Sequence, residues 1–205
     1  YAEGIAAAMA LAVDKAADYW STICFWHNGA AHQKIVNTFS RQAIPMTWDF
    51  AEGNPFSSSS GHFLRFVSLI AEVLDTSVPA APTGYARQQD AASSRPTETV
   101  VVSTDPPYFD NIGYADLSDF FFVWLRRSLR SVFPSLFATL ASPKNEELVA
   151  APYRHGGTEQ AEAFFLAGMR KALECVRFQA RPGLPVTIYY AFRQSERQGD
   201  GIASS

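Results

Sequence analysis

Apolar and polar positions in the first part of the chain follow a helical period. Residues 3–26 carry an alanine-rich run with apolar side chains on one stripe, which predicts a helix. A second apolar stripe predicts a helix over 62–75, ended by the proline-rich residues 79–82. The intervening segment, 27–61, is polar, aromatic and interrupted by prolines, which is typical of an irregular loop. Residues 1–82 are therefore predicted to be mainly helical.

The pattern changes character after residue 83. Runs of β-branched and aromatic residues indicate strands, the first of them buried, and helical periodicity indicates helices between them. The predicted elements are a strand at 97–104, helices at 116–133 and 159–181, and a strand at 185–192, with a surface loop over 142–158. This order of strand, helix, helix and strand predicts an α/β fold with a parallel sheet over a second domain, 83–205.

Composition limits the classes of protein that fit. The chain has 205 residues, of which 47% are hydrophobic and 18% charged, so a fibre or a disordered tail is excluded. With 17 basic and 20 acidic residues, it carries no strongly basic surface for nucleic acid as a whole. Cys24 and Cys175 form no CxxC pair, which argues against a zinc ribbon and against a disulfide framework. We find no signal peptide and no long apolar span, so we expect a cytoplasmic protein with no membrane partner.

The most informative motif is Asp105-Pro106-Pro107-Tyr108, here called the tetrad, which directly follows the first predicted strand. In open α/β sheets, ligands bind beyond the carboxyl ends of strands. The prolines fix φ and lack N–H groups, so the loop is stiff and its carbonyl oxygens are free acceptors. A carboxylate and a carbonyl there can accept hydrogen bonds from an exocyclic amino group. A neighbouring tyrosine can stack on a planar base that has left its duplex.

A structural interpretation of the tetrad competes with this one. Two prolines can simply end a strand, and Tyr108 can pack against the core. The combination of an aspartate, two prolines and a tyrosine at the end of a strand favours the functional interpretation.

The tetrad resembles the catalytic motif of amino-methyltransferases, which methylate adenine or cytosine amino groups from S-adenosylmethionine. The longer run 105–121 is similar to a bacterial and archaeal family of adenine-specific DNA methylases, large proteins that often also carry a zinc ribbon. The similarity extends upstream to 37–46 and 48–56 and downstream to 188–194, and thus over nearly the whole chain. It implies a partial Rossmann-like methyltransferase sheet with an N-terminal, mainly helical segment. It also implies S-adenosyl-L-methionine as cofactor and DNA as partner.

The resemblance also implies roles for single residues. Asp105, Pro106 and Pro107 would hold the target amino group while Tyr108 stacks on the base. Asp90 would lie near the adenine of the cofactor, although an acidic residue of an ordinary loop fits that position equally well. The expected substrate-binding residues are Phe109, Asn111, Tyr114, Trp48 and Asn54.

The loop 48–56 gathers two carboxylates, an amide and three aromatic residues, and two interpretations of it stay open. It can form a lid or target-recognition insertion that contacts the base. Alternatively, its aromatics anchor the loop to the core while Asp49 and Asn54 cap turns. No metal is expected here, nor at His27 and His32, because neither group has a third ligand at suitable spacing.

Three arginines follow the tetrad on the helix predicted at 116–133. Arg126, Arg127 and Arg130 share one face and could contact phosphates. A solvated face opposite a core-forming aromatic run is the favoured interpretation.

Two features of the family pattern are not found in this sequence: a glycine-rich turn after a first strand, and an acidic residue after a second one. The glycines at 156–157 and 199–201 do not fill the first position. Together with the start at Tyr1, this leads us to expect an internal fragment, inactive alone, that works with the rest of a parent polypeptide.

The sequence therefore predicts part of an S-adenosylmethionine-dependent DNA amino-methyltransferase acting on adenine N6. One alternative is a catalytically silent module that binds nucleic acid or a partner protein. Another is a methyltransferase acting on RNA or protein. A serine hydrolase is not expected, because the chain has no Gly-x-Ser-x-Gly elbow.

Overall fold

The computed structural model describes residues 1–29, 33–59, 61–76, 84–93, 98–110 and 112–190. The chain forms two compact units. Unit 1 consists of Tyr1–Gln88 and Gly113–Glu147, and unit 2 of Gln89–Ile112 and Leu148–Ser205. Both units contain helices and a small two-stranded sheet, so the chain is α/β in the general sense. The division differs from the expected boundary between 1–82 and 83–205, because residues 113–147 associate with the N-terminal helices.

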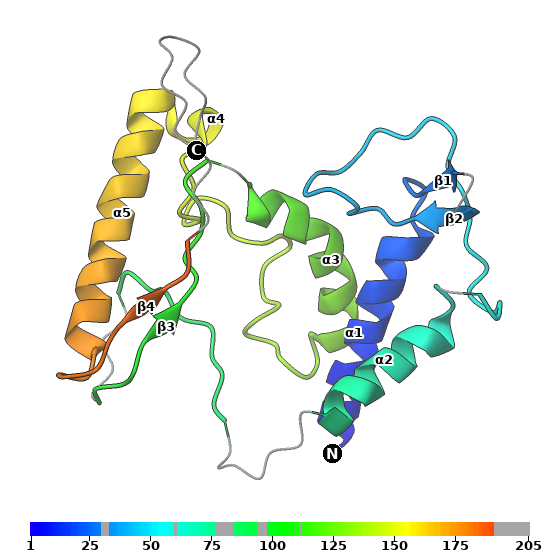
Figure 1. Cartoon of the computed structure of the whole chain (residues 1–205), viewed down its shortest axis with the longest axis horizontal. Helices are drawn as coiled ribbons and strands as arrows, with labels where there is room; N and C mark the ends of the chain where they lie inside the picture. The colour runs from blue at the N-terminus through cyan, green and yellow to red at the C-terminus, as the bar shows by residue number, and fades with distance from the viewer. Residues whose placement is uncertain (30–32, 60, 77–83, 94–97, 111, 191–205) are drawn as a thin grey trace, which may run out of the picture. The chain divides into compact units, whose positions relative to one another are not determined.

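Unit 1 is built around α1 (Ala2–Trp20), which contacts both α2 (Phe63–Thr76) and α3 (Tyr114–Leu129), as Figure 1 shows. The alanines of α1 leave room for large neighbours, so the helices approach closely. Ala10 packs with Leu129 and Phe137 on one side, while Ala12 and Ala16 pack around Phe66 on the other. The amphipathic pattern in the sequence thus predicted α2 and α3 within a few residues of their observed bounds.

The helix predicted over 3–26 is too long at its C-terminal end. The chain leaves the helix at Ser21, whose ψ of 158° is extended, and then forms β1 (Phe25–Asn28). This strand pairs antiparallel with β2 (Gln33–Val36), and Trp26 lies opposite Ile35. The pairing of aromatic with β-branched residues outweighs the weak helical preference of this region. The loop predicted over 27–61 therefore contains most of an unpredicted hairpin.

Two buried aspartates lie one turn apart on α1. Asp18 is fully engaged, since its carboxylate accepts hydrogen bonds from the Phe39 N–H (3.0 Å) and from Asn37 Nδ2 (2.8 Å). Its carbonyl accepts from the Thr38 N–H at 2.8 Å. Asp14 is 9% exposed, and in the described part of the chain its Oδ1 has no hydrogen-bond partner. Burial raises the pKa of Asp14 from 3.8 to about 7.

The segment after α3 returns to the start of that helix. The Asp119 carboxylate accepts hydrogen bonds from the Ser142 N–H (2.8 Å) and the Lys144 ammonium (2.5 Å). Burial alone would raise the pKa of Asp119, but the hydrogen bonds from Lys144 and Ser142 outweigh it and hold the pKa below 3.8. Glu147 Oε1 accepts from the Ala115 N–H at 2.8 Å, which satisfies a free donor of the first helical turn. These bonds hold the segment after α3 against that helix, and α3 joins unit 1 by packing on α1.

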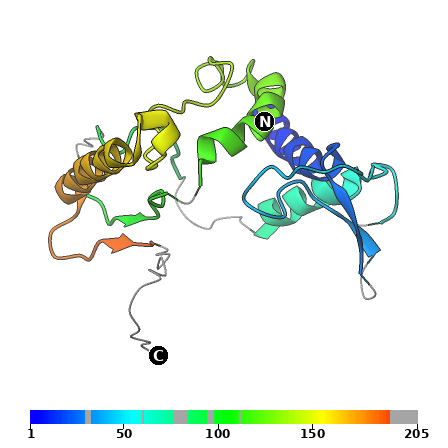
Figure 2. The ribbon, with the colours of Figure 1, turned by 90° about the horizontal axis from the view of Figure 1, so that it is seen from above.

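Unit 2 contains a parallel pair of strands, β3 (Ser103–Thr104) and β4 (Thr187–Ile188), with α5 (Thr158–Gln179) running beside them (Figures 1 and 2). Thr104 lies opposite Ile188 in the ladder. An isolated parallel bridge between Val100 and Ala180 extends the contact. The predicted parallel pairing is thus confirmed, although the regular strands are shorter than the runs at 97–104 and 185–192.

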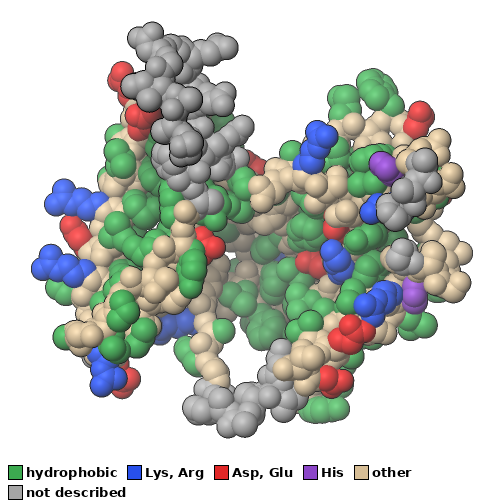
Figure 3. Space-filling view, viewed as in Figure 1, with side chains coloured by type: hydrophobic (Ala, Val, Ile, Leu, Met, Phe, Trp, Pro, Cys, Tyr) green, Lys and Arg blue, Asp and Glu red, His purple; other side chains and the backbone are tan. Residues whose placement is uncertain are grey.

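The prediction that the first strand is buried is wrong. Val101 is 62% exposed and Tyr189 59% exposed, and Figure 3 shows hydrophobic side chains at the surface of unit 2. A parallel strand is buried only when both of its edges are paired and both faces are covered. In the described part of unit 2, β3 has one partner strand, β4, and one long helix beside it, α5.

A short helix, α4 (Pro152–His155), interrupts the predicted loop at 142–158. Proline at its first position is preorganised for a helix, and Gly156 ends it with a φ of +79°. The core of unit 2 lies next to it, where Ala150, Ala161 and Phe165 are buried together and Phe109 packs against them.

None of the helices in the described ranges is long and apolar enough to cross a bilayer.

Because Asp14 is buried with no partner for its Oδ1, we expect the stability of the fold to depend on pH. Between pH 3.8 and about 7, the folded protein keeps a proton on Asp14 that the unfolded chain has released. The stability contributed by this group therefore falls as the pH rises through that window. Asp14→Asn should raise the free energy of unfolding by on the order of 1–3 kcal/mol at about pH 8 and leave it unchanged near pH 4.

Urea denaturation at the two pH values, followed by circular dichroism, measures this effect. Asp75→Asn is the matched control, because Asp75 is an exposed aspartate on α2. A pH-independent effect of Asp14→Asn would contradict the assignment.

Candidate functional site

The tetrad leaves β3 at its carboxyl end, as the sequence predicted. Two backbone hydrogen bonds set this end beside the end of β4. The Thr187 N–H donates to the Val102 carbonyl (3.0 Å), and the Tyr189 N–H donates to the Thr104 carbonyl (2.8 Å). Residues that follow the two strands therefore meet at one edge of the sheet, which is where parallel sheets bind their ligands.

Exposure differs along the tetrad. Asp105 is exposed, whereas Pro106, Pro107 and Tyr108 are half-buried. The Asp105 carboxylate can thus receive donors of a ligand. The prolines provide no N–H groups that would compete for it.

The Tyr108 ring has an aromatic neighbour in Tyr190, which follows β4. The two ring centroids are 5.4 Å apart and the planes meet at 80°, so that an edge of one ring contacts the face of the other. Tyr108 is therefore held in place by a partner ring while remaining only half-buried.

Phe109, the residue after the tetrad, is fixed by three different segments. Its N–H donates to the Tyr190 hydroxyl (3.1 Å), and its carbonyl accepts from the Ala150 N–H (2.7 Å). Its ring meets that of Phe165 on α5 edge to face, with 5.1 Å between centroids. These contacts make Phe109 the anchor of the loop, and the expected contact of its ring with substrate stays a prediction.

Tyr190 is the residue that sequence analysis missed. The sequence feature that could have indicated it is the pair of predicted parallel strands, whose carboxyl ends lie at the same edge of a sheet. Because Thr104 lies opposite Ile188, continuing the register places Pro106 opposite Tyr190. The β-branched and aromatic run 185–192 predicted the strand, but not which tyrosine reaches the tetrad.

Asp90 belongs to unit 2, where it forms a turn. Hydrogen bonds from the Ser93 side chain and the Ala92 N–H lower the pKa of its carboxyl, and the Ala92 bond is 2.9 Å long. The Ala92 carbonyl in turn accepts from the Cys175 thiol on α5 at 3.3 Å. This geometry matches the interpretation of Asp90 as a loop residue, and its role toward a cofactor stays a prediction.

Three of the expected substrate-binding residues, Trp48, Asn54 and Tyr114, belong to unit 1, whereas the tetrad belongs to unit 2. Tyr114 is the first residue of α3 and is 41% exposed. Asn111 lies outside the described residues.

The interpretation of the loop 48–56 as aromatic anchors with turn-capping polar residues holds only in part, and the lid interpretation stays a prediction. Asn54 Oδ1 accepts from the Phe56 N–H at 2.9 Å, so Asn54 does shape a turn. Trp48 and Phe56 do not anchor the loop, because they are 88% and 92% exposed. Backbone contacts hold it instead, including the 2.9 Å bond from the Ala51 N–H to the carbonyl of Cys24.

The basic and histidine residues considered above lie in unit 1 as well. Arg126 donates from Nε to the Thr139 carbonyl (2.8 Å), while Arg127 and Arg130 are exposed. His27 Nδ1 accepts from the Gly29 N–H, as expected for a turn, and His32 is not among the described residues. Within the described ranges, no group of three or more histidine, cysteine or acidic side chains is placed to hold a metal.

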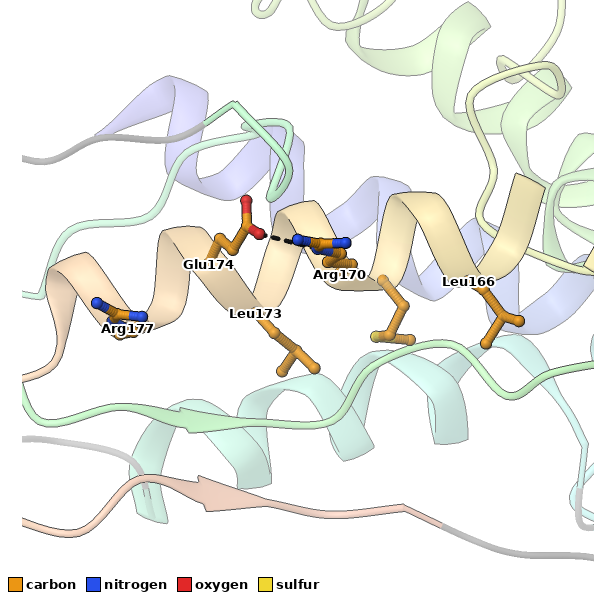
Figure 4. Close-up of a pocket in the computed structure, with 6 residues that line it drawn as sticks. Leu166, Arg170, Leu173, Glu174 and Arg177 are labelled. Atoms are coloured by element: carbon orange, nitrogen blue, oxygen red, sulfur yellow. Dashed lines mark hydrogen bonds and ion pairs between the residues drawn. The ribbon is translucent and has the colours of Figure 1, made fainter. Parts of the chain in front are cut away.

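A second surface feature of unit 2 is an open groove of about 440 Å³ along α5 (Figure 4). Leu166 and Leu173 point to the same side of the helix, and Arg170 pairs with Glu174 at 3.1 Å. Its lining residues are Leu166, Met169, Arg170, Leu173, Glu174 and Arg177. None of them belongs to the tetrad or its anchors.

The described glycines bear on the turn that the resemblance assigns to the cofactor. Four described glycines have positive φ, namely Gly61, Gly156, Gly157 and Gly183. None of them directly follows β3 or β4. The glycine turn that the resemblance assigns to the methionine part of S-adenosylmethionine is therefore not formed by these residues.

Comparisons with protein-family profiles, with curated proteins and with solved structures find no match to this chain.

The anchoring of Phe109 makes a prediction about loop order. Phe165→Ala removes the ring beneath Phe109, so residues 105–110 should exchange amide hydrogen at least about tenfold faster, since Phe→Ala in a core costs roughly 3–5 kcal/mol. Hydrogen exchange read by mass spectrometry checks this. Leu166→Ala is the control, because the neighbouring Leu166 is 64% exposed. Equal exchange in the two variants would show that Phe165 does not hold the loop.

Proposed function

We propose that this chain supplies the catalytic loop of an S-adenosylmethionine-dependent DNA amino-methyltransferase that acts on adenine N6. In this proposal, β3 and β4 belong to a Rossmann-like sheet. One observation carries it: an Asp-Pro-Pro-Tyr loop at the carboxyl end of a parallel strand, with an exposed carboxylate and an aromatic ring held beside it. The resemblance of residues 105–121 to adenine-specific DNA methylases supports the choice of reaction.

The tetrad would act by accepting hydrogen bonds from the target amino group. One N–H donates to the Asp105 carboxylate and the other to the Pro106 carbonyl. Both acceptors draw the nitrogen lone pair out of conjugation with the base and orient it toward the methyl donor. S-adenosylmethionine, when bound, supplies the electrophilic methyl group. The nitrogen releases a proton to the Asp105 carboxylate, and because Asp105 is exposed, this proton can pass on to water.

Stiffness of the loop is part of the mechanism. The two prolines restrict φ, and both the N–H and the carbonyl of Phe109 are hydrogen-bonded. The acceptors are thus positioned before the base arrives, and no ordering is needed at the moment of reaction.

Tyr108 would hold the flipped base by stacking. Stacking of one base on an aromatic side chain contributes about 1–3 kcal/mol and does not depend strongly on base identity. The hydrogen bonds of the tetrad would then exclude thymine, which has no exocyclic amino group, and the choice of adenine over cytosine rests on the resemblance of residues 105–121.

The exposed aromatic residues of the loop 48–56 favour a second function, a binding module without catalysis. Trp48 and Phe56 present large apolar surfaces of the kind used in recognition. This function requires no methyl transfer, so one assay separates the two.

The test is transfer of labelled methyl groups by the full-length protein that carries this chain, with DNA, RNA and protein as separate acceptors. Asp105→Ala should lower transfer to DNA by at least about 10²-fold, because it removes a hydrogen-bond acceptor that is preorganised at the reacting group. Asp105→Asn keeps one acceptor oxygen and should recover part of the rate.

Asp110→Ala is the matched control, since Asp110 is another exposed aspartate close to the tetrad. Transfer that survives Asp105→Ala would refute the proposed site. Binding of DNA without any transfer would favour the binding module, and preferential labelling of RNA or protein would reassign the substrate.

A further inference from the structure

We infer that Tyr190 is a positioning residue of the tetrad, an inference that rests on the proposed function. Its hydroxyl accepts the hydrogen bond of the Phe109 N–H at 3.1 Å. Its ring contacts that of Tyr108 edge to face at 5.4 Å. One side chain thus fixes both the stacking residue of the tetrad and the residue that follows it.

The need for such a residue follows from the prolines. Pro106 and Pro107 have no N–H, so the sheet cannot secure this part of the loop through backbone donors. Tyr108 and Phe109 are the next residues with N–H groups. The Phe109 N–H does not continue the ladder between β3 and β4, but goes to the hydroxyl of Tyr190.

The strand register explains why Tyr190, and not Tyr189, serves this purpose. Successive side chains of an extended chain point to opposite sides. The backbone N–H of Tyr189 continues the pairing with Thr104, and its side chain is 59% exposed. Tyr189 is therefore a natural control: the same residue type, one position away, without a described contact to the tetrad.

The inferred role is to set the distance and angle between the tetrad and a stacked base. Without the hydroxyl, Phe109 loses the hydrogen bond of its N–H and keeps the one at its carbonyl. The Tyr108 ring is then held only by its packing against the ring at position 190. Removal of the whole side chain also removes that packing. Tyr190→Phe and Tyr190→Ala therefore separate the two contributions.

The experiment measures methyl transfer to DNA and hydrogen exchange in the full-length protein. Tyr190→Phe should lower kcat about three- to tenfold, the change expected for one lost hydrogen bond, and leave the KM for S-adenosylmethionine unchanged. Exchange of residues 105–110 should accelerate by a similar factor. Tyr190→Ala should lower kcat by about 10²-fold. Tyr189→Phe should leave kcat and exchange as they are.

Each outcome is informative. Unchanged exchange and unchanged kcat in Tyr190→Phe would overturn the inference. A purely structural role would accelerate exchange throughout unit 2, including α5, and raise the KM for the cofactor, and this result would overturn it as well. If the unmutated protein transfers no methyl group, the proposed function fails. The exchange data then still show whether Tyr190 holds the loop.

Discussion

The parallel pairing of β3 with β4 determines where the tetrad and Tyr190 lie. The bonds from the Thr187 and Tyr189 N–H groups fix the register of a very short ladder. Because parallel strands end at the same edge, the tetrad leaves the sheet beside Tyr190. The contacts of Phe109 with Ala150 and with α5 then tie this edge to the core of unit 2. A shift of one residue in that register would move Tyr190 away from the tetrad and break its contacts with Tyr108 and Phe109.

Unit 1 shows the same dependence on a few polar contacts. Its helices meet through the alanines of α1, but the chain beyond α1 is held by the Asp18 carboxylate and carbonyl. Asp18 is buried with its hydrogen bonds made, and Asp14 is buried with one oxygen unpaired. The difference explains why the pKa of Asp14 rises on burial: its charged form loses water and gains no donor at Oδ1. Burial of Asp14 therefore couples the stability of this unit to pH.

Sequence periodicity predicted the features that depend on local pattern. It predicted the amphipathic helices, the two strands of unit 2 and the position of the tetrad after a strand. The order of strands and helices, and not periodicity, indicated a parallel sheet. Features decided by distant contacts could not be predicted. The hairpin of β1 and β2 forms where the sequence indicated helix and loop, and Val101 is exposed despite its apolar neighbours. The role of Tyr190 depends on register, which a pattern of apolar residues in one strand does not specify.

The proposed function requires that the tetrad present acceptors to the exocyclic amino group of adenine. The most direct measurement is mass spectrometry of nucleosides from DNA incubated with the full-length protein and S-adenosylmethionine bearing a deuterated methyl group. We expect label on the exocyclic nitrogen of adenine, giving N6-methyladenine that carries all of the deuterium. Label on a ring carbon, as in 5-methylcytosine, or DNA that is bound but stays unlabelled, would refute the proposed function.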